Sequence, residues 1–292
     1  MITDRDERIL DDLVRYFVLS RPQIQRLHFP DDGNGRSARR RLQMLVDLQL
    51  MNRQHLLYSH PSGGSPASVY FPSRRGCEYL FEKTGDERYL LTPTSAPIPH
   101  HINHWIAISE THIALDAALR RESELAVENW INEWDICNKD ETVPEKRYRL
   151  YTLLKDEPRI ICAPDAGFLL SMNGHRKAFY VEQDRNTSGV YQVASGKTKG
   201  YAVMAELNLH RRHFPQATVN SFTVIMVAPS PKRRDALRHA VQDKPGAHLW
   251  RFASATDLTP EAFLYAPIFY PCEGESVSLV KRPTRESSES SD

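Results

Sequence analysis

The sequence predicts a mixed α+β or α/β protein of two domains, and three observations lead to this fold class. The first part carries three amphipathic helical patterns followed by two short strand-like segments. From residue 100 the pattern runs helix, three strands, helix, strand, and then one more helix and strand. Between these parts, residues 91–99 contain three prolines in nine positions, which is typical of an extended linker. We therefore expect domains at 1–90 and 100–270, a linker at 91–99, and a disordered Ser- and Glu-rich tail at 271–292.

Local signals define the first three helices. Thr3 is a suitable N-cap with Asp6 three positions later, and apolar residues follow at helical spacing. Ser20 can cap a second, short helix that carries Pro22 in its first turn. A Gly-Asn-Gly stretch then interrupts the chain before a third helical pattern. The expected helices span residues 4–18, 22–28 and 37–48.

A β-hairpin is expected after the third helix. Its strands are residues 52–58 and 68–71, and the Pro-Ser-Gly-Gly-Ser-Pro stretch at 61–66 forms a flexible tip. A further helix follows at about 74–83. Three helices followed by a hairpin is the order of a winged helix-turn-helix, whose third helix enters the major groove of DNA. We therefore expect residues 1–90 to be a winged helix-turn-helix domain that binds double-stranded DNA.

One face of the third helix is basic. At about 100° per residue, Arg36, Arg39, Arg40 and Gln43 gather on one side, opposite the apolar side. Residues 34–56 contain five Arg and one Asp, a local charge of +4 by subtraction, which suits a surface of phosphates. The alternative is a solvated helix face in a domain that binds protein.

The second part of the chain has the element order of a restriction-endonuclease-like core. Its first helix includes Trp105 and Leu119, and a strand, a hairpin and a long helix follow at 126–136, 163–184 and 190–213. A continuous apolar strand at 221–227, a helix at 231–242 with a solvated basic start, and a strand at 248–252 complete the series. This αβββαβ order with an appended helix and strand predicts that fold for residues 100–270.

The hairpin at 163–184 brings carboxylates together. Asn173-Gly174 suits a type I′ turn, so Met172 faces His175 and, counting outward, Asp165 faces Glu182. Asp184 follows Glu182 on the same side of the strand. Like charges so placed repel, and a hard divalent cation, Mg²⁺ or Mn²⁺, would relieve the conflict. The alternative is a set of solvated charges at the end of a strand.

These residues resemble the PD-(D/E)XK nuclease pattern. Pro164-Asp165 is similar to its first element and Glu182-Gln183-Asp184 to its second. Asp184 stands where the pattern has a lysine, and Lys197 and Lys199 in the following helix are the nearest replacements. The resemblance implies a catalytic set of Asp165, Glu182, Asp184 and Lys197, with the three carboxylates as metal ligands.

Most of residues 4–255 resembles the replication-relaxation family of plasmids and other mobile elements. The likeness is carried by Thr3-Asp4-Arg5-Asp6 with Ile9-Leu10, Arg39-Arg40-Arg41-Leu42 with Leu45-Val46 and Leu50, Glu110, Pro164-Asp165, Glu182-Gln183-Asp184-Arg185, and Lys197 with Tyr201. It implies a role in the replication, relaxation or mobilisation of plasmid DNA. Other replication or mobilisation proteins are then expected as further partners.

Three roles remain open at this stage. The first is a metal-dependent DNA-nicking enzyme, in which Lys197 offsets phosphate charge beside the bound cation. The second is a non-catalytic accessory factor or transcriptional regulator with a degenerate nuclease fold, which Asp184 in place of lysine favours. The third uses Tyr180 or Tyr201 as a nucleophile, against packing roles for both.

Composition narrows the class of protein further. The formal net charge is +1, so DNA binding must come from local patches and not from the whole molecule. The four cysteines have no C-x-x-C spacing and are expected to be reduced thiols. No apolar run approaches a membrane span and no phosphate-binding glycine loop is present. We expect a cytoplasmic protein without membrane contact or ATPase activity, and the sequence leaves open whether it forms a homodimer.

Overall fold

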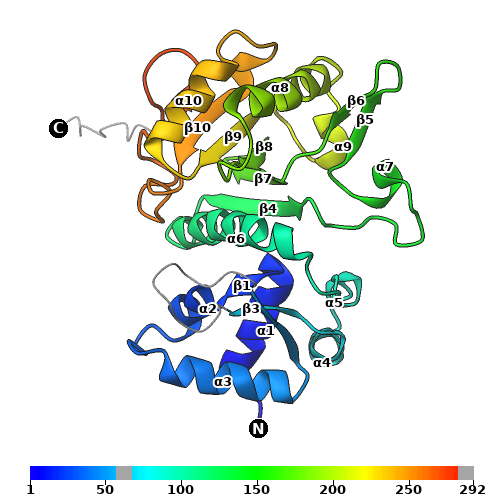
Figure 1. Cartoon of the computed structure of the whole chain (residues 1–292), viewed down its shortest axis with the longest axis vertical. Coiled ribbons are helices and arrows are strands. Elements are labelled where there is room, and N and C mark those ends of the chain that lie inside the picture. The colour runs from blue at the N-terminus through cyan, green and yellow to red at the C-terminus, as the bar shows by residue number, and fades with distance from the viewer. Residues whose placement is uncertain (57–67, 282–292) are drawn as a thin grey trace, which may run out of the picture. The chain divides into compact units, whose positions relative to one another are not determined.

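The computed structural model describes residues 1–56 and 68–281, and contacts divide the chain into two units (Figure 1). Unit 1 comprises Met1–His112 and Trp134–Thr142, and unit 2 comprises Ile113–Glu133 and Val143–Asp292. The predicted linker at 91–99 contains the end of helix α5 (Arg88–Leu91) and the first residue of α6 (Pro99–Leu119). No helix among the described residues is long and apolar enough to cross a membrane. The protein is a mixed α+β chain.

Unit 1 begins with three helices and a small sheet. The order of its strands is β1-β3-β2, and both pairs are antiparallel. The capping signals are confirmed, because the Thr3 amide donates to the Asp6 carboxylate over 2.6 Å and the Ser20 hydroxyl accepts from the Gln23 amide. The elements are α1 (Asp4–Tyr16), β1 (Leu19–Ser20), α2 (Arg21–His28), α3 (Arg36–Asp47), β2 (Met51–His55), β3 (Ser68–Pro72) and α4 (Arg74–Thr84). The predicted hairpin tip at 61–66 lies outside the described residues.

The first helix stops two residues earlier than expected. Phe17, at the C-cap, has φ of 64° and ψ of −61°, a strained backbone conformation that cannot continue a right-handed helix. Its side chain is nevertheless only 4% exposed, so the turn places an aromatic ring in the core. The free energy gained by burying Phe17 outweighs the cost of its backbone conformation. Because Phe17 is apolar, the spacing of apolar residues predicted a helix that extends past its observed end.

A buried ion pair ties α1 to α3. Asp6 is fully buried, and the Arg41 guanidinium binds both of its carboxylate oxygens, one of them at 2.6 Å from Nε. Burial raises the pKa of Asp6, but the hydrogen bonds from Arg41 and Thr3 outweigh burial and leave it below its ordinary value. This contribution to stability is present above the ordinary Asp pKa and is lost as the pH falls through the lowered one.

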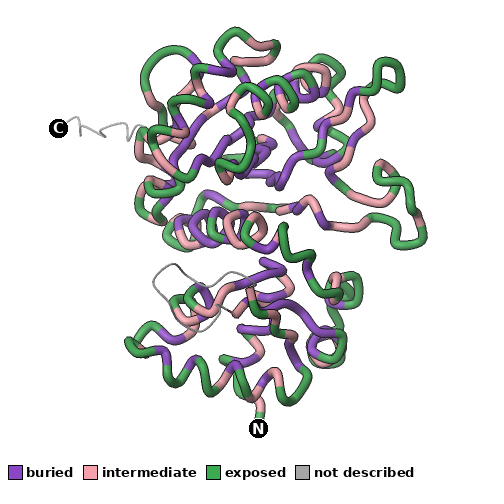
Figure 2. The backbone as a smooth tube through the Cα atoms, viewed as in Figure 1, coloured by how far each residue is buried: buried purple, intermediate pink, exposed green. Residues whose placement is uncertain are grey.

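Unit 2 is built on a mixed sheet of six strands in the order β11-β10-β9-β8-β7-β4. β8, β9 and β10 run parallel to one another, and the remaining pairs are antiparallel. The strands are β4 (Leu125–Asn132), β7 (Ala166–Met172), β8 (His175–Gln183), β9 (Phe222–Ala228), β10 (Trp250–Ser254) and β11 (Tyr270–Pro271), with β5 (Thr152–Lys155) and β6 (Ile160–Cys162) as a separate pair. All of β9 is buried, as expected for a central apolar strand (Figure 2).

Two helices cover one face of this sheet. Side chains of α8 (Val190–Glu206) and α10 (Pro231–Val241), including Tyr201 and Leu237, share one buried cluster with Tyr180 of β8 and Val224 of β9. On the other face, three aromatic rings stack. The ring centres of Trp130 and Phe168 are 5.4 Å apart, and those of Phe168 and Phe179 are 5.0 Å apart. Short helical turns complete the unit at α7 (Pro144–Arg147), α9 (His210–His213) and η1 (Ala247–Leu249).

The hairpin register is confirmed. Met172 pairs with His175, Phe168 with Phe179, and Ala166 with Val181, with Asn173 and Gly174 both at positive φ in the turn. The helix predicted at 190–213 is interrupted at residues 207–209, since α8 ends at Glu206 and a left-handed Asn208 (φ 52°) separates it from α9. Asn tolerates that conformation better than most residues, so the break has a local cause.

Strand boundaries differ from those predicted in two places. The strand expected at 126–136 ends at Asn132 after a bulge between Val127 and Asn129, and the strand expected at 248–252 is displaced by η1 to Trp250–Ser254. The tail was expected from residue 271, yet Phe269 bridges Val277 and the Val280 amide donates to the Leu264 carbonyl. Residues 282–292 lie outside the described residues.

Replacing Arg41 with Ala is expected to lower the free energy of unfolding by about 3 kcal/mol, because it leaves a buried Asp6 without its cation. Adding Asp6→Ala should recover part of that loss, so the double variant should be more stable than the sum of the singles. Urea titration of the four proteins measures this coupling. Arg40→Ala, at the exposed neighbouring position, serves as control and should change stability by less than about 0.5 kcal/mol.

Candidate functional site

Two carboxylates meet where β7 begins and β8 ends. Asp165 directly precedes β7 and Glu182 is the penultimate residue of β8, one step beyond the pair formed by Ala166 and Val181. The Asp165 side chain also accepts a hydrogen bond of 2.7 Å from the Gln183 amide. Both residues are buried, at 8% and 2% exposure. The predicted juxtaposition of Asp165 and Glu182 is therefore present in the structure.

Helix α8 supplies a cation to this pair. The Lys197 ammonium donates to Asp165 Oδ1 over 3.3 Å and to Glu182 Oε2 over 2.5 Å. One turn later, the Tyr201 hydroxyl donates to the second Glu182 oxygen, Oε1, over 2.6 Å. Lys199, the other candidate lysine, is exposed on the opposite side of the helix. Of the two lysines, Lys197 is the one that reaches the carboxylates.

A glycine lets α8 approach closely enough for this contact. A Cβ on Gly200 would lie 2.5 Å from the carbonyl oxygen of Ile161 in β6, closer than side chains approach backbone atoms. Gly200 separates Lys199 from Tyr201, so any outward shift of the helix there would also move Lys197 and Tyr201. The small residue is thus part of the machinery that positions the charged pair.

The cluster perturbs its own pKa values. Burial, reinforced by the charge of Asp165, raises the pKa of Glu182 to about 8 despite the opposing effect of Lys197. Burial lowers the pKa of Lys197, but the two carboxylates outweigh burial and leave it raised. Burial therefore disfavours the negative charge of Glu182, and the Lys197 ammonium favours it. Perturbed pKa values of this kind gather at functional sites.

Asp184 has a different partner. Arg233, in the first turn of α10, binds both of its carboxylate oxygens, with Nε at 2.8 Å from Oδ2 and Nη2 at 3.0 Å from Oδ1. The guanidinium is 11% exposed and the Asp184 carboxylate 4%. The predicted group of three carboxylates is thus divided between Lys197 and Arg233.

Parallel strand order explains why Arg233 reaches Asp184. β8 and β9 are parallel, so their carboxyl ends meet at one edge, where Asp184 follows β8 and α10 begins just after β9. The expectation of a solvated basic helix start is wrong for Arg233 and for Arg234, which is 9% exposed and pairs with Asp235 and Asp257. The sequence analysis did not assign Arg233 to the site. The signal was the basic start of the helix after β9, because β9 is parallel to β8 and β8 is followed by Asp184.

The two candidate tyrosines are buried and hydrogen-bonded. Tyr180 is fully buried and bonds His213 Nδ1 over 2.8 Å, while the other ring nitrogen of His213 bonds Thr152 over 2.8 Å. Burial lowers the pKa of His213 to about 4 and raises that of Tyr180 well above its ordinary value. Tyr201, also buried, donates to Glu182. This environment supports the packing and positioning roles and gives no support to nucleophilic ones.

The donor set can be tested against a divalent cation. Asp165 Oδ1 and Glu182 Oε2 are hard oxygen donors of the type that Mg²⁺ and Mn²⁺ bind, and both are directed at one point. That point is now taken by the Lys197 ammonium, so the residues fit a metal only when Lys197 moves aside. Asp184 could contribute only after release from Arg233.

A second group of candidate residues lies on α3 in unit 1. Arg36, Arg39, Arg40 and Gln43 are all exposed, as the helical spacing predicts, whereas Ala38, Leu42 and Leu45 are buried. Gln43 accepts from Arg53 over 2.6 Å and donates to Asp47 over 2.7 Å. Among residues 1–56 and 68–281, no carboxylate forms an ion pair with Arg36, Arg39 or Arg40. Their charges are available to an outside partner.

Glu182→Gln should remove a pH dependence of stability. The raised pKa of Glu182 means that its stabilising effect is complete below the ordinary Glu pKa and is lost as the pH rises toward 8. Relative to the Gln variant, the wild type should lose a few kcal/mol between pH 5 and 8, since one pKa unit corresponds to about 1.4 kcal/mol. Chemical denaturation across this range measures the difference. Asp165→Asn should move the midpoint to lower pH, and a parallel pair of stability curves would contradict the assignment.

Comparison with known proteins identifies the family of this chain. The sequence model of one family, described as replication-relaxation, matches residues 10–217, well over half of the chain, and thereby confirms the predicted resemblance. No match was found among curated proteins or among solved structures. The matched region contains α3 as well as Asp165, Glu182 and Lys197. The chain belongs to the replication-relaxation family.

Proposed function

We propose that this protein binds duplex DNA of a plasmid or mobile element and nicks it with the aid of a divalent cation. The family suggests a role in the replication or relaxation of such DNA, which makes DNA or replication proteins the expected partners. The observation that carries the proposal is the convergence of Asp165, Glu182 and Lys197 on one point at the end of β8. Two acids that hold a cation and a lysine that offsets phosphate charge can together promote phosphodiester cleavage.

DNA contact is assigned to α3. It is the third helix of unit 1, it precedes strands β2 and β3, and its outward arginines have no ion-pair partners among the described residues. This order supports a winged helix-turn-helix, in which such a helix lies in the major groove. Arg side chains there can bind phosphates or, with two hydrogen bonds, guanine.

Each residue of the cluster then has a defined role. Asp165 and Glu182 would hold the cation, and Lys197, once displaced from them, would face the phosphate charge. Tyr201 keeps Glu182 oriented through its hydrogen bond to Oε1. The chemistry that Mg²⁺ or Mn²⁺ supplies when bound is polarisation of a phosphoryl oxygen and a lowered pKa of bound water.

A specific observation favours a second candidate, a DNA-binding accessory factor or regulator without catalysis. Lys197 already neutralises the Asp165 and Glu182 pair, and Arg233 binds Asp184 through two hydrogen bonds. A buried site whose charges are balanced internally needs no cation for stability. The nuclease-like arrangement would then be a structural remnant.

Replacing Arg36, Arg39 and Arg40 with Ala should weaken duplex binding and flatten its salt dependence. Each lost phosphate contact removes about 0.9 from the slope of log affinity against log salt. Fluorescence anisotropy at several salt concentrations measures the slope, with Arg74→Ala plus Arg75→Ala on exposed α4 positions as the control. An unaltered slope in the α3 variant would remove α3 from the DNA-binding surface.

Cleavage is tested with supercoiled plasmid in Mg²⁺, Mn²⁺ or EDTA. The wild type should produce nicked circles only with a cation, and Asp165→Asn should lose at least about a hundredfold in rate, the order of loss when one electrostatic stabilising group is removed. The same cations should raise Tm in the wild type and not in Asp165→Asn plus Glu182→Gln. DNA binding without nicking or cation-dependent stabilisation would establish the second candidate.

A further inference from the structure

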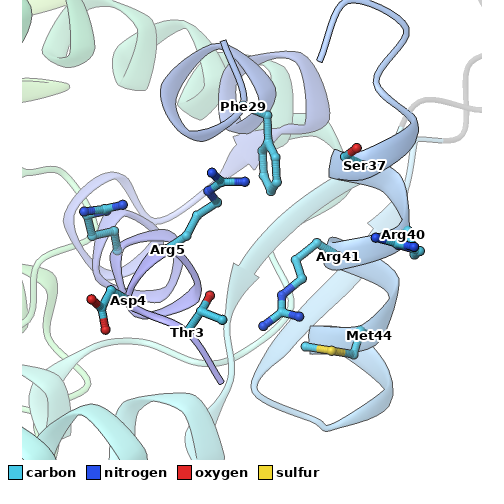
Figure 3. Close-up of a pocket in the computed structure, with 9 residues that line it drawn as sticks. Thr3, Asp4, Arg5, Phe29, Ser37, Arg40, Arg41 and Met44 are labelled. Atoms are coloured by element: carbon cyan, nitrogen blue, oxygen red, sulfur yellow. The ribbon is translucent and has the colours of Figure 1, made fainter. Parts of the chain in front are cut away.

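A cavity of about 800 Å³ lies between α1 and α3 in unit 1. Figure 3 shows Arg5 extending from α1 toward Phe29 and Arg41 extending from α3 toward the start of α1. The wall consists of Thr3, Asp4, Arg5, Arg8, Phe29, Ser37, Arg40, Arg41 and Met44. Four arginines and one aspartate therefore surround this space, which we call the α1–α3 pocket.

Most of this positive charge is uncompensated. Arg41 is neutralised by the buried Asp6, but Arg5, Arg8 and Arg40 are exposed. Within residues 1–56 and 68–281, none of these three forms an ion pair with a carboxylate. A concave surface with several unpaired guanidinium groups concentrates positive potential and attracts anions.

One of the three arginines is held in place before any ligand arrives. The Arg5 guanidinium lies 4.9 Å from the centre of the Phe29 ring, and that ring is only 5% exposed. A guanidinium stacked on a fixed aromatic face loses less freedom on binding than an unsupported one. The pocket thus contains a pre-oriented donor as well as charge.

The pocket adjoins the proposed DNA-reading face of α3. At about 100° per residue, the α3 positions that line the pocket form a face next to the one that carries Arg36, Arg39 and Gln43. Arg40 belongs to both faces. A helix in the major groove, about 12 Å wide, has a phosphate backbone along each side. The pocket therefore lies where one of these backbones would run.

We propose that the α1–α3 pocket binds a backbone phosphate of the duplex whose groove receives α3. Arg5 and Arg8 of α1 and Arg40 of α3 are its ligands. The inference rests on the proposed DNA binding by α3 and adds a separate anchor, on a different helix, that fixes the register of α3 without reading sequence. Asp4, the one acidic residue of the wall, opposes this binding.

The test uses the full-length chain and duplex DNA in anisotropy titrations over a range of salt. Arg5→Ala with Arg8→Ala should lower the log–log salt slope by about 0.9, the value for the loss of one phosphate contact. The loss of affinity should be the same for duplexes of different sequence. Asp4→Asn should tighten binding. The control is Arg74→Ala with Arg75→Ala, which removes the same charge from exposed positions on α4 and should leave the slope unaltered.

The outcomes separate the pocket from the proposed function. If the wild type binds DNA and the α1 double variant, folded by circular dichroism, keeps its salt slope, the pocket proposal is overturned while α3 binding stands. If the α4 control loses as much slope, the effect is general charge and the pocket is again rejected. Absence of DNA binding by the wild type rejects both. Calorimetry with inorganic phosphate supplies a last arm, because binding of free phosphate without any change in DNA affinity would make this a small-anion site.

Discussion

A carboxylate buried in a protein needs a cation or several hydrogen-bond donors, and this requirement governs where the helices of both units pack. Asp6 is matched by Arg41 of α3, and Asp184 by Arg233 of α10. Lys197 of α8 forms ion pairs with both Asp165 and Glu182. In each case a strand or helix end presents the acid and a neighbouring helix delivers the base. Moving any of these helices by one turn would leave a buried charge alone.

The same requirement separates structural arginines from those available for binding. Arg41 lies in a run of three arginines, yet it alone among them faces a buried acid, while Arg39 and Arg40 face solvent. Arg233 and Arg234 follow an exposed lysine and both pair internally. A basic run in a sequence is therefore no guide to DNA contact by itself. What matters is which of its members form an ion pair, and among the described residues no carboxylate pairs with Arg5, Arg8, Arg36, Arg39 or Arg40.

The cluster at Lys197 joins four side chains in one network. The Lys197 ammonium bridges Asp165 and Glu182, and the Tyr201 hydroxyl donates to the second Glu182 oxygen. Burial and the charge of Asp165 raise the pKa of Glu182 despite the neighbouring ammonium. The two functions proposed above differ in whether a metal ion replaces Lys197 at these carboxylates.

Much of this arrangement follows from the sequence alone, because the signals are local. The Asn173-Gly174 turn determined the register that aligns Asp165 with Glu182, and helical spacing determined which side of α3 is basic. Spacing also placed Lys197 and Tyr201 on one side of α8. Only the tertiary structure decided which acid each cation meets. Asp184 pairs with Arg233 and not with Lys197 because α10 starts at the same sheet edge where β8 ends. The two residues are 49 positions apart in the sequence, so no local pattern predicts their contact. The sequence does not distinguish which basic residue pairs with which carboxylate, because that choice depends on how distant helices and strands pack together.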